Sequence, residues 1–164
     1  MKKQIIYKCI LLTLTLAINV FIIVNSCLNG STSGTESNGV AHFFANIINF
    51  IGPNTINDSN FADFAYVIRK LIGHFGLFLV NGLLSFVTAH EFMKNWRFAE
   101  FYWTIAVTLF FGLFMASLSE VIQLFTPGRF GSMADVGIDF GGFALGAGIS
   151  FLILVLSKQI KFDK

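Results

Sequence analysis

The sequence predicts an all-α membrane protein, a bundle of four transmembrane helices with a long first extracytoplasmic loop that carries a short amphipathic helix. Of its 164 residues, 55% are hydrophobic and only 12% are charged, a composition typical of membrane proteins rather than soluble domains. Four continuous apolar runs are each long enough to cross a hydrocarbon core of about 30 Å as a helix. Because four such helices form one small bundle, we expect a single membrane domain over residues 1–164.

The predicted spans cover about 5–26, 71–93, 99–125 and 136–157. Spanning β-strands are disfavoured, because the runs are continuous and lack alternating polarity. The first run follows a basic start and ends near the sequence VNSC, so a cleaved signal peptide is an alternative interpretation. Its apolar region is long for a signal, which favours a retained helix.

The distribution of Lys and Arg predicts the orientation of the bundle. If both termini are cytoplasmic, the inside segments hold eight of these residues and the outside segments hold three. This bias predicts a multi-pass protein of the cell membrane with both termini in the cytoplasm. The three outside residues are Arg69, Lys70 and Arg129. Since topology does not require them there, they need another explanation.

The outer loop, residues 27–68, divides into three parts. Its start, CLNGSTSGTESNG, is rich in Ser, Gly and Asn and is predicted to be flexible. Apolar residues then recur at helical spacing from Val40 to Ile51, and Gly52 and Pro53 end that amphipathic helix. A second short pattern, residues 61–68, leads towards the second span. Both segments either lie in the outer membrane interface or pack on the top of the bundle.

The second span carries a stripe of polar residues at spacings that place them near one helical face. Such a face is expected to point into the bundle, where polar groups find partners. Two of its members, Ser85 and Thr88, need only hydrogen-bond between helices. His74 lies one turn beyond a basic pair and is either a site residue or a buried structural imidazole. The stripe consists of Lys70, His74, Asn81, Ser85 and Thr88.

The third and fourth spans carry carboxylates near their outer ends. Glu120 lies on the third span, with Gln123 one turn beyond it. A carboxylate exposed to lipid costs on the order of a few kcal/mol, so it must be paired, hydrated or protonated. On the fourth span Asp135 and Asp139 are four residues apart. Two GxxxG spacings follow, Gly142 with Gly146 and Gly137 with Gly141, and these favour close helix packing.

These polar residues lie at similar depth, close to the outer boundary, on interior faces of different helices. The sequence therefore predicts one cavity of mixed charge that opens to the outside. Its predicted ligand-binding residues are Arg69, Lys70, His74, Glu120, Gln123, Arg129, Asp135 and Asp139.

The motifs RKLIGHFGLFLVNGLL and SLSEVIQLFTPGRFGSMADVGIDFGGFALG resemble the VanZ-like family of small bacterial membrane proteins. The resemblance covers roughly residues 65–150. The namesake of the family is associated with low-level resistance to the glycopeptide teicoplanin. The resemblance thus implies glycopeptide resistance or cell-envelope modification, as in Gram-positive bacteria. It also implies that the family's polar positions are all of the predicted ligand-binding residues except Asp139, where the family usually has Asn.

Three interpretations of the cavity remain open. In the first, arginines provide forked donors to a membrane-linked anion, such as the phosphate of a lipid-linked cell-wall precursor. In the second, the protein is an acid–base or metal-assisted enzyme acting on such a precursor. In the third, the charges form a structural ion-pair network that binds nothing. Candidate catalytic residues for the second are His74, Glu120, Asp135 and Asp139.

The absence of a nucleophile motif, of HExxH and of CxxC disfavours the enzyme, so no residue is assigned as catalytic. No cofactor, resident metal or nucleic-acid partner is expected. Four helices without an internal repeat also disfavour a transporter. The sequence does not predict an oligomeric state.

Overall fold

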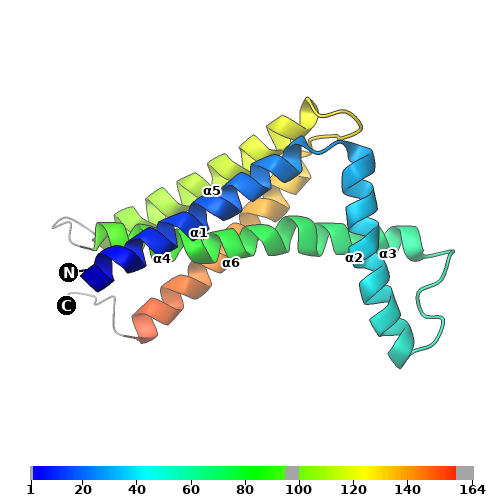
Figure 1. The fold of residues 1–164 in the computed structure, drawn as a ribbon, viewed down its shortest axis with the longest axis horizontal. Coiled ribbons are helices and arrows are strands. Elements are labelled where there is room, and N and C mark those ends of the chain that lie inside the picture. Colours follow the sequence, from blue (N-terminus) through cyan, green and yellow to red (C-terminus); the bar gives the residue numbers. More distant parts are fainter. Residues whose placement is uncertain (1, 95–99, 158–164) are drawn as a thin grey trace.

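The structure is a computed structural model that describes residues 2–94 and 100–157, and the elements within these ranges are helices. Three long helices, α1 (Lys2–Cys27), α5 (Glu100–Leu124) and α6 (Met133–Leu156), form a bundle with α4 (Leu77–Met93) (Figure 1). Helix α4 continues without a break from α3 (Phe61–Ile68) and a π-helix, η1 (Arg69–Gly76). Helix α2 (Gly30–Ile51) lies crosswise at one end of the bundle, opposite the start of α1 and the end of α6 (Figure 1).

Within residues 2–94 and 100–157, four helical segments are long and apolar enough to cross a membrane, which confirms the predicted number of spans. They are Lys2–Cys27, Phe61–Met93, Tyr102–Leu124 and Met133–Leu156. The second differs from the predicted 71–93, because the short amphipathic pattern of residues 61–68 runs helically into the span. The residues between α4 and α5, where the predicted third span begins, lie partly outside the described ranges.

The bundle core is formed by large side chains from all four spans. Helices α4 and α5 contact each other, and each also contacts α1 and α6. Ile22 of α1, Phe78 of α4, Met115 of α5 and Phe143 of α6 share one buried cluster. Ile22 is only 2% exposed, so α1 is packed into this core.

Glycines allow α6 to approach η1 and α4 closely. A Cβ atom added at Gly142 would collide with the backbone of Phe75, and one added at Gly146 would collide with the backbone of Leu79. This pair therefore serves the close helix packing expected of a GxxxG spacing. The other spacing, starting at Gly137, faces open space and contributes nothing to this contact.

Helix α2 begins ten residues earlier than the amphipathic pattern, so the prediction of a flexible 27–39 segment is wrong. The side chain of Asn29 caps the first turn, where it accepts a 2.9 Å hydrogen bond from the backbone N–H of Thr32. The N–H of Gly30 donates to the carbonyl of Pro127 at 2.9 Å. A cap and a long-range backbone bond thus stabilise a helix that the Ser/Gly composition disfavours.

The amphipathic part of α2 packs on α3 through small residues. Ala41 is fully buried with Ala65 and Ile68 of α3. The predicted apolar face is divided, since Phe44 packs against this cluster whereas Phe43 and Ile51 are 62% and 82% exposed. The amphipathic helix is confirmed, and part of its apolar surface, including Phe43 and Phe50, is left uncovered by the described residues.

The π-helix changes the rotational register of the second span. In η1 the N–H of Leu77 donates to the carbonyl of Ile72, five residues earlier. A π turn contains more residues than an α turn, so positions on either side of it no longer keep the α-helical phase.

The polar stripe is therefore divided between two neighbouring helices, and the prediction of one shared face is wrong. Lys70 and His74 in η1 bond to carboxylates of α6. Asn81 in α4 bonds instead to Asn19 of α1. All three still point into the bundle, as their polarity requires.

Candidate functional site

Two ion pairs join η1 to α6. Lys70 Nζ is bonded to Asp135 Oδ1, and His74 Nδ1 lies 3.0 Å from Asp139 Oδ1. Because both members are four residues apart on each helix, the two pairs stack one turn above the other. The pairs differ in depth: the side chain of Lys70 is 17% exposed, whereas that of Asp139 has no exposed surface.

Glu120 is fixed from two sides. Its Oε1 accepts a 2.8 Å hydrogen bond from Gln123 on the same helix, and its Oε2 accepts a 2.9 Å bond from the backbone N–H of Ser132. Ser132 caps the N-terminus of α6, where the helix dipole favours a negative charge. His74 Nδ1 lies 3.9 Å from Glu120 Oε1. The imidazole is therefore placed between carboxylates from two different helices.

Arg129 fastens the α5–α6 hairpin to the junction of α1 and α2. Its Nη2 donates to the carbonyl of Asn25 at 2.8 Å, and its Nε donates to the carbonyl of Leu28 at 3.2 Å. Its Nη1 donates to Gln123 Oε1 at 3.2 Å. Gly128, with φ of +72°, provides the left-handed turn that aims the side chain there. Each guanidinium nitrogen of Arg129 thus has a protein acceptor. The predicted contact of Arg129 with an anion stays a prediction.

Arg69 differs from Arg129 in having donors to spare. Its Nε is buried and has no hydrogen-bond partner among the described residues. Its guanidinium lies 6.0 Å from the centroid of the Tyr66 ring. Burial, followed by the nearby positive charge of Arg69, lowers the pKa of the Arg129 guanidinium. Two arginines of like charge therefore lie close together, and among the described residues Arg69 is the one with a buried N–H that lacks a partner.

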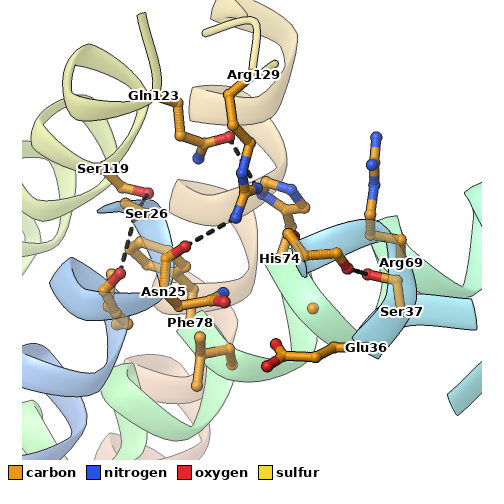
Figure 2. Close-up of a pocket in the computed structure, with 14 residues that line it drawn as sticks. Asn25, Ser26, Glu36, Ser37, Arg69, His74, Phe78, Ser119, Gln123 and Arg129 are labelled. Carbon is orange, nitrogen blue, oxygen red and sulfur yellow. Dashed lines mark hydrogen bonds between the residues drawn. The ribbon is translucent and has the colours of Figure 1, made fainter. Parts of the chain in front are cut away.

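Two adjoining polar cavities, of about 60 and 140 Å³, lie between these side chains. Figure 2 shows the first, with Arg129 reaching across to Asn25 and the carboxylate of Glu36 on the opposite side. A third cavity of about 290 Å³ lies between α2 and α3, and Arg69 also lines it. The residues common to both polar cavities are Ser33, Arg69, His74, Gln123 and Arg129.

The structure brings the predicted site residues together at one end of the bundle. Glu120 and Asp139 do not line the polar cavities; they are buried behind His74, which does. Lys70 is held at the side by its pair with Asp135. The site is thus a cavity bordered by cations, with a buried group of carboxylates beneath it.

Sequence reasoning missed the contributions of α1 and α2 to the cavity. Asn25 and Ser26 line it from α1, and Ser33, Glu36 and Ser37 line it from α2. One signal was present: positions 33, 36 and 37 have the spacing of one helical face. It was hidden because the Ser/Gly-rich composition indicates a loop.

Four apolar helices with a charged site buried at one end define a small multi-pass membrane protein. A model of the VanZ/LLP1 family matches residues 7–155, nearly the whole chain, so the chain belongs to this family. The match confirms the resemblance found in residues 65–150 and extends it over α1 and α2. Comparison with curated proteins and with solved structures finds no match.

Proposed function

We propose that this VanZ/LLP1 protein binds the anionic head group of a membrane lipid, such as the phosphate of a lipid-linked cell-wall precursor. By holding that precursor it contributes to cell-envelope modification or to resistance against glycopeptides of the teicoplanin type. The observation that carries the proposal is the position of Arg69, where the polar cavities meet the cavity between α2 and α3.

The two kinds of cavity match the two parts of an amphipathic lipid. Arg69 and Arg129 line the polar side, and a guanidinium offers phosphate a planar fork of donors. The cavity between α2 and α3 is bordered by apolar residues, including Phe61, Ala65 and Tyr66. A lipid would place its phosphate at Arg69 and its chain along α2, whose uncovered Phe43 and Phe50 would themselves contact the membrane interface.

This proposal places the cavity on the outer side of the cell membrane, with both termini cytoplasmic, as the Lys and Arg bias favours. The test begins from a variant in which the exposed Cys9 and Cys27 are replaced by Ser. Exposed positions at either end then receive one cysteine each, as Ser59→Cys or Ser157→Cys. A membrane-impermeant maleimide applied to intact cells should label only the first variant. Labelling at position 157 alone would reverse the orientation.

Lipid extraction and mass spectrometry of the purified protein test the binding itself. Protein from a Gram-positive host should carry a polyprenyl phosphate or diphosphate, and Arg69→Gln should lose it. The matched control is Lys94→Gln, which removes a cation at the opposite end, where Lys94 pairs with Glu91 at 2.7 Å. Equal lipid in wild type and Arg69→Gln would contradict the proposal.

Susceptibility to teicoplanin and vancomycin tests the biological role separately. Expression of the wild type in a susceptible host should raise the inhibitory concentration of teicoplanin, and Arg69→Gln should not. An unchanged profile with wild type present in the membrane would remove the resistance role while leaving lipid binding in place.

A second candidate function is an acid–base or metal-assisted enzyme that acts on the same lipid. The observation that favours it is the His74 imidazole, 3.0 Å from one carboxylate and 3.9 Å from another. Glu120→Gln keeps the side-chain shape and removes the charge. If lipid head groups are the same in cells expressing wild type and this variant, the enzymatic function is excluded.

A further inference from the structure

We propose that His74, Glu120 and Asp139 form a binding site for one divalent transition-metal cation, with Mn²⁺ or Zn²⁺ as the fitting class. One donor atom from each residue lies within 4.8 Å of the others. The two distances from the imidazole nitrogen, 3.0 and 3.9 Å, match the separation of neighbouring donors around one ion, about 3 to 4 Å when each bond is about 2.0–2.2 Å. No local metal-binding motif is present in the sequence, because the three ligands come from η1, α5 and α6.

Asp139 provides an independent observation that points to a ligand. Its side chain has no exposed surface, and its Oδ2 has no hydrogen-bond partner among the described residues. A buried carboxylate oxygen without a partner is costly, and native structures normally satisfy such atoms. A cation bound by both carboxylate oxygens of Asp139 would satisfy this oxygen.

The neighbouring cations do not balance the negative charges of Glu120 and Asp139. Lys70 is engaged by Asp135, and the guanidinium of Arg129 bonds to carbonyl groups and to Gln123. Within the part of the chain that the structure describes, only the imidazole of His74 forms ion pairs with Glu120 and Asp139. Histidine binds metals in its neutral form, so one divalent ion would balance both negative charges.

Neighbouring groups also orient the metal-binding side chains, and the polar cavities give a metal ion access to them. Gln123 and the N–H of Ser132 hold the carboxylate of Glu120 in place, as outer partners commonly do around a metal. His74 lines both polar cavities, so unfilled coordination positions would face them. The site uses none of the arginines proposed to bind the lipid, and the two proposals are independent.

Metal titration of the full chain in detergent tests the site. Protein stripped with EDTA is titrated with MnCl₂, with free Mn²⁺ followed by electron paramagnetic resonance. Bound Zn²⁺ is measured by elemental analysis after dialysis against ZnCl₂. We expect one ion per chain for either metal and competition between them. Asp139→Asn should lower the affinity at least about tenfold, the least that loss of an outer partner commonly costs.

A control variant separates this site from general acidity. Glu91→Gln removes another buried carboxylate, at the opposite end of the bundle, where it pairs with Lys94, and should bind metal like the wild type. If Asp139→Asn does not fold, as judged by helicity and gel filtration, His74→Gln takes its place. Fewer than one ion per wild-type chain would overturn the proposal, as would equal affinity in the wild type and a folded ligand variant. Arg69→Gln should lose lipid and keep metal, so failure of one proposal is distinguishable from failure of the other.

Discussion

Two polar regions lie inside the same bundle, and they differ in whether their polar groups have hydrogen-bond partners. One region, which we call the uncharged ladder, lies midway along α1 and α4. Its side chains form hydrogen bonds with one another. Asn19 and Asn81 exchange hydrogen bonds of 3.1 and 3.3 Å, and Thr15 bonds to Thr88 at 2.8 Å. The ladder consists of Thr15, Asn19, Asn81, Ser85 and Thr88.

The charged cluster at the cavity end is not satisfied in this way. Asp139 keeps a buried oxygen without a partner, and the adjacent Arg69 keeps a buried N–H without one, among the described residues. Neutral groups that pair completely stabilise helix packing, whereas charges left partly unpaired beside a cavity support the ligand binding proposed for that end. The cluster consists of Lys70, His74, Glu120, Asp135 and Asp139.

The largest effect on stability is expected from breaking one ion pair of the charged cluster. Lys70→Met leaves Asp135 unpaired beside the remaining carboxylates and should lower the free energy of unfolding by about 3 kcal/mol. Denaturation in detergent micelles, followed by circular dichroism, measures the loss. The double variant Lys70→Met/Asp135→Leu should recover most of it. Equal losses in the single and double variants would show that the pair itself does not matter.

A smaller effect is expected from the contact on which both regions depend, the approach of α6 to α4. Gly146→Ala forces a methyl group against the backbone of Leu79 and should cost about 2 kcal/mol by overpacking. Gly137→Ala is the matched control on the same helix, because its added methyl group meets open space. The same unfolding measurement should show no loss for the control. A comparable loss of unfolding free energy in both variants would show that the loss comes from replacing glycine in the helix backbone and not from packing against α4.

The smallest effect is expected in the uncharged ladder. Asn19→Leu removes the partner of Asn81 and should cost about 1 kcal/mol, within the range of hydrogen bonds between membrane helices. The double variant Asn19→Leu/Asn81→Leu should be close to wild type. Lipid retention and metal binding should not change in either variant. A loss of binding here would contradict the division of the polar residues into two regions.

Much of the fold follows from local pattern in the sequence. Apolar runs predict the spans, and the spacing of Asp135 with Asp139 predicts that both face the same neighbour. The bonds of Arg129 were not predictable, because it donates to the carbonyl groups of Asn25 and Leu28, and every residue has a carbonyl. The start of α2 depends likewise on the carbonyl of Pro127, nearly a hundred positions away.

The π-helix also has no signature in composition, and it separates the two polar regions in phase. A deletion of one residue that converted η1 (Arg69–Gly76) to an ordinary α-helix would turn Lys70 and His74 away from α6 while α4 kept its own contacts. The chain would still be apolar enough to insert and long enough to span. We therefore expect insertions and deletions in this segment to be tolerated far less than apolar substitutions in the lipid-facing parts of the same helix. The number of residues in η1 is as much a property of the site as their identity.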